Sequence, residues 1–172
     1  MNNPGGGVTV MSEETVTAAV REFCGYAEPE LDLEDVCLEV RAGAAEVGRA
    51  LARRVRHITA LDESLEALAD GKRRADRDAL TNITFQRGDA AALPYLDRTF
   101  TLLLCNDALG TVADPVAVLR ELVRVSRPGA GIVVADPDFS EADLCALVVA
   151  AGGEIKRSKT SGSRAFVHAT AH

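Results

Sequence analysis

Short apolar runs alternate with amphipathic segments from Asp35 to the end of the chain. A continuous apolar run predicts a buried strand, whereas apolar residues every three or four positions predict a helix with one buried face. This alternation is typical of βαβ units around a parallel sheet. The expected strands are 35–40, 57–61, 82–86, 100–105, 131–135, 154–159 and 164–169. The expected helices are 12–26, 44–56, 63–75, 140–151 and one that starts at Asp114.

Capping and turn residues support these boundaries. Ser12, followed by two Glu residues, is typical of a helix start, and Asp114-Pro115 places a capping Asp before a Pro at the first helical position. Ser140 with Asp143 resembles a capping box, although Asp replaces the usual Glu. Arg127-Pro128-Gly129 is expected to stop the fourth helix as a turn. The polar link at 160–163 predicts a closing hairpin.

The fold class that follows is α/β, a single doubly wound Rossmann-like sandwich. About seven strands are expected, mostly parallel, with an antiparallel strand at the C-terminal end. We expect residues 1–10, which are rich in Gly and Asn, to be a flexible lead before a domain at 11–172. The helix at 12–26 is expected to act as a partial cap on that domain.

Composition narrows the classes of function. The chain has 172 residues, with 19 Lys and Arg against 26 Asp and Glu, and a formal net charge of −7. This balance argues against a nucleic-acid clamp, which neutralises phosphates with Lys and Arg. The basic clusters at 53–56 and 72–74 are interpreted as solvated helix faces. No apolar run reaches the about 18 residues of a membrane span, and residues 1–10 lack the pattern of a signal peptide.

The cysteines are scattered and form no C-x-x-C pair. Most lie in strongly apolar or periodic segments, so they are interpreted as small core residues. We therefore expect no zinc or other metal site, and a reducing, cytoplasmic setting. The sequence alone leaves a Cys24–Cys37 pair open. The cysteines are Cys24, Cys37, Cys105 and Cys145.

Candidate binding residues end the predicted strands, because ligands of open α/β sheets bind outside the carboxyl ends of the strands. Asp62 ends the second strand, nineteen residues beyond Gly43. A carboxylate at this spacing can accept from both hydroxyls of an adenosine ribose, but helix capping also explains it. Asp89 follows the third strand, where it can meet an adenine amino group or simply shape the turn after Gly88.

Taken in order, these segments resemble the class I S-adenosylmethionine-dependent methyltransferases. They are most similar to the methyltransferase type 11 branch, which contains ubiquinone- and menaquinone-biosynthesis enzymes. The resemblance covers roughly residues 35 to 136. It is carried by Leu38-Glu39-Val40 with Gly43, by residues 59–64, by Gly88-Asp89-Ala90 with Leu93-Pro94-Tyr95, by Phe100, and by residues 120–129.

The resemblance implies S-adenosylmethionine as cofactor, S-adenosylhomocysteine as product, and a role for each matching residue. Glu39 would hold the methionine end, Gly43 would let the backbone approach, and Asp62 would bind the ribose hydroxyls. Arg41 and Glu63 are further expected cofactor-binding residues. Asp89 and Ala90 would meet the adenine, and Asn106 would face the sulfonium.

The sequence also departs from the family pattern. Arg41 and Ala45 replace the outer two glycines of the usual glycine-rich loop, and only Gly43 remains. Arg41 can swing outward, pair with the cofactor carboxylate, or fill the pocket. Thr101 replaces the usual Asp after Phe100, and Gly110-Thr111 replaces a His-rich pair. These changes are expected to erode the ligand-facing edge.

No catalytic base stands out, and methyl transfer does not require one, since positioning and desolvation supply much of the acceleration. His57 begins a strand and is interpreted as structural, as is His168. Asp107, Asp136 and Asp138 lie at the productive edge, where helix or turn capping explains them equally well.

Three functions remain in view. The first is methyl transfer from S-adenosylmethionine to an unidentified acceptor. The second is a catalytically inactive binding or partner module that has lost the cofactor. The third, a nicotinamide-dependent oxidoreductase, lacks the G-x-G-x-x-G spacing, because Gly48 is the next glycine after Gly43. Without a long insertion for a lid, the acceptor site is expected to be open, or completed by a homodimer or partner subunit.

Overall fold

Helices and strands alternate along residues 16–172, which are the residues that this computed structural model describes. The α-helices are α1 (Ala18–Ala27), α2 (Glu46–Leu51), α3 (Leu65–Arg77), α4 (Pro115–Val125) and α5 (Glu141–Ala150). The strands are β1 (Val36–Val40), β2 (His57–Asp62), β3 (Ile83–Arg87), β4 (Phe100–Asn106), β5 (Ser126–Asp136), β6 (Glu154–Ser161) and β7 (Arg164–Thr170). Short 3-10 helices are η1 (Glu28–Glu30), η2 (Ala52–Arg54) and η3 (Leu109–Thr111).

The strands form one seven-stranded sheet in the order β3-β2-β1-β4-β5-β7-β6. The neighbours from β3 to β5 are parallel, and β7 pairs antiparallel with both β5 and β6. The expected α/β class, the strand number and the antiparallel final strand are therefore confirmed. The chain leaves β1 in one direction to β2 and β3, and returns on its other side at β4. This reversal is the switch point where ligands of doubly wound sheets bind.

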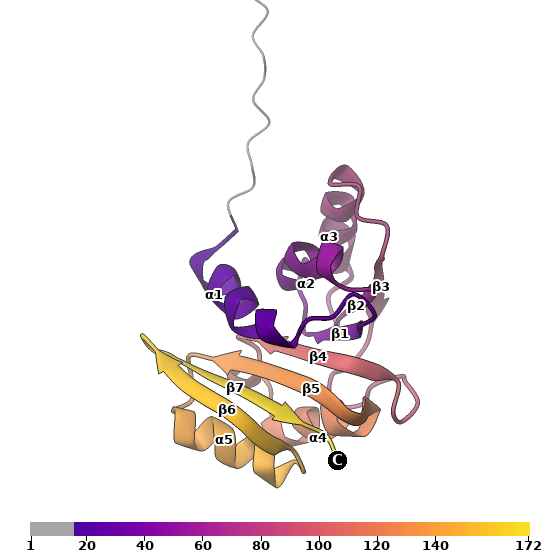
Figure 1. Ribbon diagram of the computed structural model, residues 1–172. Coiled ribbons are helices and arrows are strands. Elements are labelled where there is room, and N and C mark those ends of the chain that lie inside the picture. The colour runs from indigo at the N-terminus through magenta and orange to yellow at the C-terminus, as the bar shows by residue number, and fades with distance from the viewer. Residues whose placement is uncertain (1–15) are drawn as a thin grey trace, which may run out of the picture.

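Helices cover both faces of the sheet (Figure 1). α1, α2 and α3 lie on one face, and α4 and α5 lie on the other. Alternate residues of β4 enter the two cores, Leu103 and Cys105 with α4 and α5, and Leu102 and Leu104 with α1 and α2. A central strand that is buried on both faces explains the unbroken apolar run in its sequence. Among residues 16–172, no helix is long and apolar enough to cross a membrane.

Two helices are shorter than their apolar patterns predict. The first begins at Ala18 rather than near Ser12, because the Thr17 hydroxyl accepts the hydrogen bond of the Val20 amide and caps it. Ser12 and the expected lead at 1–10 lie outside the described residues. The second helix begins only at Glu46, because Ala45 has a positive φ of 55° and cannot belong to a right-handed helix. Asp114 and Ser140 cap their helices as predicted.

Arg127-Pro128-Gly129 is not the turn that the sequence predicted. α4 ends at Val125, and β5 begins directly at Ser126 and runs through this segment. The pairing of β4 with β5 is irregular here, since Phe100 pairs with Ser126 but Leu102 already pairs with Gly131. Gly129, with φ of 78°, lies in this irregular stretch. The extra residues bulge out of the sheet at the amino end of β4.

The closing hairpin is confirmed, and its second strand brings further residues to the carboxyl edge of the parallel strands. β6 and β7 are joined at Gly162-Ser163, and β7 is inserted between β5 and β6. Asp136 at the carboxyl end of β5 pairs with Ala165 near the start of β7. The first residues of β7 therefore lie at the carboxyl edge of the parallel strands.

Tyr95 offers a test of the packing on the α4 side of the sheet. Its ring packs edge-on against Phe100 with centroids 5.0 Å apart. Its hydroxyl is the one buried side-chain polar atom without a hydrogen-bond partner in the described part of the chain. Leaving such a group unpaired costs about 1–3 kcal/mol. We expect Tyr95→Phe to raise the free energy of unfolding by about 1 kcal/mol in urea denaturation.

Tyr26→Phe is the matched control. The Tyr26 hydroxyl donates to the Arg157 carbonyl oxygen at 3.0 Å, so its removal is expected to lower the free energy of unfolding by about 1 kcal/mol. Equal losses in the two variants would show that the Tyr95 hydroxyl is paired in solution.

Candidate functional site

The loop from β1 to α2 keeps a glycine-like backbone although two of the three glycines of the family pattern are replaced. Arg41, Gly43 and Ala45 have φ values of 50°, 56° and 55°. These are the alternate positions at which the family pattern has glycine, so the replacements change the side chains and leave the left-handed turns in place. A non-Gly residue in this conformation costs roughly 1–2 kcal/mol. The surrounding structure therefore holds this loop against its intrinsic preference.

Asp62 ties this loop to the end of β2. The Gly43 amide donates to Asp62 Oδ2 at 2.9 Å, and the Ser64 amide donates to Oδ1 at 2.9 Å. Ser64, whose hydroxyl accepts from Ala67, caps α3. The capping interpretation of Asp62 is therefore wrong. Its carboxylate instead faces the loop after β1, with each oxygen fixed by one backbone amide.

Glu39 lies beneath the loop and is buried. Its Oε2 accepts the hydrogen bond of the Gly48 amide at 2.8 Å. A Cβ on Gly48 would lie 2.6 Å from that oxygen, so any larger residue there would displace the Glu39 carboxyl group. Burial raises the pKa of Glu39 to about 8, although the Gly48 hydrogen bond opposes the shift. The carboxyl group is thus a buried group that the Gly48 amide holds against the first turn of α2.

Asn106 and Asp107, at the end of β4, are held by an arginine from the final hairpin. Arg164, whose side chain is only 10% exposed, donates to Asp107 Oδ1 at 2.7 Å and also to Asn106 Oδ1. It reaches α1 as well, through the Ala19 carbonyl oxygen at 3.0 Å and an ion pair with Glu22 at 3.5 Å. Arg164 therefore fixes both the end of β4 and the helix beside it.

Arg41 extends across the carboxyl edge of β1. Its Nη1 lies 3.6 Å from Glu63 Oε2, just after β2, and its Nη2 donates to Thr111 Oγ1 at 3.2 Å, beyond β4. The guanidinium thus bridges the segments that follow β2 and β4, and the three arrangements that the sequence left open for it remain predictions. Glu63 is consequently an exposed partner of Arg41.

Asp89 and Ala90 follow β3. Asp89 is exposed, and its Oδ1 accepts the hydrogen bond of the Ala91 amide at 2.8 Å. This bond is the turn role that the sequence offered as one of two explanations. Ala90 is buried in the core beneath. The adenine roles of both residues remain predictions.

Asp136 and Asp138 shape the segment after β4. Asp136 is buried, and its two oxygens accept from the Gly110 amide at 3.1 Å and the Asp138 amide at 2.9 Å. A Cβ on Gly110 would lie 2.0 Å from Asp138 Oδ2. The Gly110-Thr111 pair thus fits its own surroundings, and the carboxylates act as turn-shaping groups.

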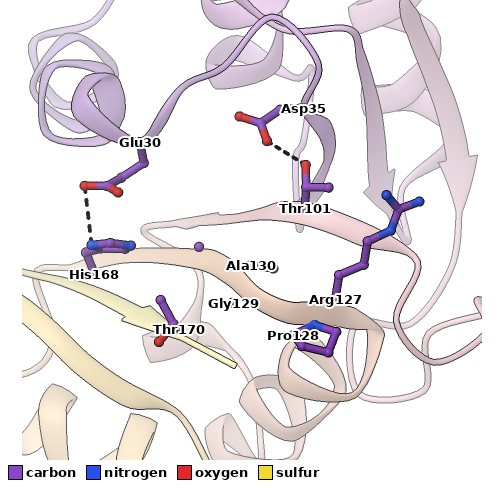
Figure 2. Close-up of a pocket in the computed structure, with 10 residues that line it drawn as sticks. Glu30, Asp35, Thr101, Arg127, Pro128, Gly129, Ala130, His168 and Thr170 are labelled. Carbon is purple, nitrogen blue, oxygen red and sulfur yellow. Dashed lines mark hydrogen bonds and ion pairs between the residues drawn. The ribbon is translucent and has the colours of Figure 1, made fainter. Parts of the chain in front are cut away.

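Thr101 does not erode the ligand-facing edge, contrary to the prediction. It is the second residue of β4, at the opposite edge, where it donates to Asp35 Oδ1 at 2.6 Å and accepts from the Val36 amide at 2.9 Å. It lines a cavity of about 380 Å³ between the start of β1 and the bulged start of β5 (Figure 2). Glu30 and His168 face each other across this cavity, 3.4 Å apart.

Two cysteines and His57 are interpreted as structural residues and not as nucleophiles or bases. Burial raises the pKa of Cys24 to about 11 and of Cys105 to about 12, so both thiols stay protonated at neutral pH. His57 bonds to Thr84 within the sheet, as a structural residue would. Within residues 16–172, no group of three or more His, Cys, Asp or Glu side chains is arranged to hold a metal ion.

The structure thus brings most of the predicted residues to one edge. Arg41, Gly43, Asp62 and Glu63 are linked by direct contacts, Asn106 ends the neighbouring β4, and Glu39 lies underneath. Sequence reasoning missed Arg164, because an arginine at the start of a strand carries no signal until the position of β7 in the sheet is known. It also missed the contact between Arg41 and Thr111, which are 70 residues apart.

The residues fit an adenosine-containing cofactor. Each Asp62 oxygen accepts a single amide hydrogen bond and keeps capacity for a hydroxyl, since a carboxylate has about four acceptor sites. A Cβ placed on Gly43 would meet no atom within 4 Å, so the space beside this backbone is open. The carboxylates around it suit a cofactor that carries an ammonium and a sulfonium.

Comparison with known proteins agrees with this geometry. Residues 32–170 match the family described as a methyltransferase domain. The demethylmenaquinone methyltransferase of Halalkalibacterium halodurans is 34% identical over 99 residues, which are 58% of this chain and 40% of that protein. The ubiquinone/menaquinone biosynthesis C-methyltransferase of Roseobacter denitrificans is 32% identical over 100 residues, 56% of this chain and 40% of that protein. The match thus spans about two-fifths of these relatives.

The solved structure of the [4+2]-cyclase SpnF superimposes with a TM-score of 0.82 at 20% identity, covering 90% of this chain and 81% of that one. At this identity the likeness concerns the fold alone. A cyclase with the same fold also shows that the reaction must be argued from the site.

Glu39 leads to a prediction on pH dependence. Its pKa is about 8 in the folded chain against an ordinary value of 4.5. Between these values the folded state keeps a proton that the unfolded state has lost, so the free energy of unfolding falls as pH rises. Glu39→Gln keeps an acceptor for the Gly48 amide and cannot ionise. We expect it to be more stable than wild type at pH 8, by on the order of a few kcal/mol, with the advantage shrinking toward pH 5.

Urea denaturation at a series of pH values measures this difference. The control is Glu66→Gln, an exposed change in the first turn of α3. A wild-type advantage over Glu39→Gln that is constant across the pH range would contradict the prediction.

Proposed function

This chain belongs to the methyltransferase domain family, and we propose that it binds S-adenosylmethionine at the carboxyl edge of β2, β1 and β4 and transfers its methyl group. When bound, the cofactor would supply a methyl carbon on a sulfonium, which passes to a nucleophilic atom of the acceptor and leaves S-adenosylhomocysteine. The observation that carries the proposal is the Asp62 carboxylate, which the Gly43 and Ser64 amides hold beside the uncrowded Gly43 backbone and which keeps further acceptor capacity.

Each residue at the edge has a proposed task. Asp62 accepts from the ribose hydroxyls, and the left-handed loop at Gly43 lets the backbone approach. Asp89 and Ala90 lie at the adenine, with the exposed carboxylate as acceptor and the buried methyl beneath it. Asn106, whose side-chain oxygen accepts from Arg164, is proposed to face the sulfonium side because it ends β4 at this edge.

Glu39 contributes through its buried carboxyl group. An ammonium placed near it would favour the ionised form, because an opposite charge lowers the pKa of a carboxyl. Holding the methionine end and releasing the proton would thus occur together. Arg41 is proposed to act on that same end, and Glu63 is the residue that it contacts when no cofactor is bound.

The inactive-module alternative is not favoured. The family match and the named relatives are methyltransferases, and the replaced glycines leave the loop backbone in its left-handed form. The acceptor is proposed only as a molecule with a nucleophilic atom that reaches this edge. Demethylmenaquinone is not proposed as the acceptor, because the match spans only 40% of the relative that is named for it.

Partners and location are proposed from the sequence. A homodimer or a partner subunit is proposed to complete the acceptor side, where α1 is the helix linked to the edge through Arg164. The net charge of −7 argues against nucleic acid as acceptor. A cytoplasmic location rests on the scattered cysteines.

Isothermal titration with S-adenosylhomocysteine tests the proposal. Wild type is expected to bind with micromolar affinity, about 8 kcal/mol. Asp62→Asn removes the charge and half of the acceptor capacity, so binding is expected to weaken at least about tenfold. Asp76→Asn, an exposed change on α3 that breaks only an ion pair with Lys72, is the control and should bind as wild type. Folded wild type that binds nothing at millimolar ligand, or an Asp62→Asn variant that binds normally, would refute it.

A further inference from the structure

Arg41 combines backbone strain with a poorly anchored charge. Its φ of 50° is a conformation that glycine adopts freely and arginine does not. Its guanidinium contacts Glu63 at 3.6 Å, and the two side chains are 31% and 61% exposed. Exposed ion pairs of this kind contribute little, because water competes for both partners. The exposed ion pair with Glu63 is therefore too weak to explain why an arginine occupies this strained backbone position.

Two departures from the family pattern meet at this residue. Arg41 stands where the pattern has glycine, and Thr111 stands where it has a His-rich pair. The Arg41 Nη2 donates to Thr111 Oγ1 at 3.2 Å, and that hydroxyl in turn donates to the Ala108 carbonyl oxygen at 2.7 Å. The threonine, in η3 after β4, therefore holds one side of the guanidinium, while Glu63, directly after β2, contacts the other side.

The carboxyl edge of the sheet is acidic, and the Arg41 guanidinium is a positive charge within it. Asp62, Glu63 and Asp107 make the edge acidic, which suits a sulfonium and an ammonium but repels a carboxylate. Arg164 is committed to Asp107 and Glu22. Arg41 is the cation that lies over β1 between Asp62 and the end of β4. A cofactor with an amino-acid carboxylate needs such a cation at this end.

We propose that Arg41 is a specificity-determining residue that exchanges Glu63 for the carboxylate of the cofactor's amino-acid end, while Thr111 keeps the guanidinium in place. The inference rests on the proposed function and deepens it. A guanidinium and a carboxylate form charge-assisted, often bidentate hydrogen bonds, which are stronger than the contact that Glu63 makes. The exchange therefore favours ligands that carry the carboxylate.

Titration with two ligands isolates this role. S-adenosylhomocysteine carries the carboxylate, whereas its decarboxylated analogue keeps the adenosine, the thioether and the ammonium. Arg41→Gln is expected to weaken S-adenosylhomocysteine about tenfold and to leave the decarboxylated analogue unchanged. Glu63→Gln releases Arg41, so it should strengthen S-adenosylhomocysteine by up to about fivefold without affecting the analogue. Asp62→Asn should weaken both ligands alike.

Other results overturn the inference. If Arg41→Gln binds both ligands more tightly, Arg41 obstructs the site, and if it binds both as wild type does, Arg41 has no role in binding. In either case S-adenosylhomocysteine still binds, and the proposed function stands. If neither ligand binds wild type or any variant while circular dichroism shows folded protein, the proposed function fails and the inference fails with it.

Discussion

The hydrogen bond from the Gly43 amide to Asp62 joins two strand ends that the candidate site depends on. It fixes the loop after β1 in its left-handed conformation and, from the other side, orients the carboxylate at the end of β2. The second oxygen is fixed by Ser64, which caps α3. The loop after β1, the Asp62 carboxylate and the start of α3 therefore form one hydrogen-bonded unit. The strained φ values of Arg41 and Ala45 persist because this unit is anchored on both flanks.

A second linkage closes the other side of the edge. Arg164 comes from β7, whose antiparallel insertion beside β5 brings its first residues to the carboxyl end of β4. By binding Asp107 and the Ala19 carbonyl oxygen, it couples the end of β4 to α1. The final hairpin thus has a role beyond extending the sheet. It supplies the buried cation that keeps an acidic edge together.

The fold was largely predictable from the sequence, because strands buried on both faces leave unbroken apolar runs such as 102–105. The resemblance to class I S-adenosylmethionine-dependent methyltransferases is likewise confirmed at the level of the family. Element ends were less predictable. Ala45 looks like a good helix residue and yet has a positive φ, since the loop, not its own propensity, decides its conformation. Arg127-Pro128-Gly129 looks like a turn, but sheet pairing absorbs it as a bulge.

The site was predictable only where adjacent strand ends bring residues together. The strand ends placed Gly43 and Asp62 at one edge, but the sequence did not predict the hydrogen bond between them. Nothing in the sequence pairs Arg41 with Thr111 or Arg164 with Asn106. Thr101 shows the opposite error, because a departure from the family pattern was assigned to the ligand edge although its strand position places it at the other end. A replacement in a family motif can therefore be interpreted functionally only after its position in the fold is known.

A crystal structure of the wild-type chain with S-adenosylhomocysteine tests the account most directly. We expect the ribose hydroxyls to bind Asp62, with the Gly43 hydrogen bond retained, and the Arg41 guanidinium to move from Glu63 to the ligand carboxylate. A ligand bound at the amino-edge cavity beside Thr101 and His168, or a carboxyl edge that stays closed by Arg41 and Glu63 with ligand in excess, would contradict it.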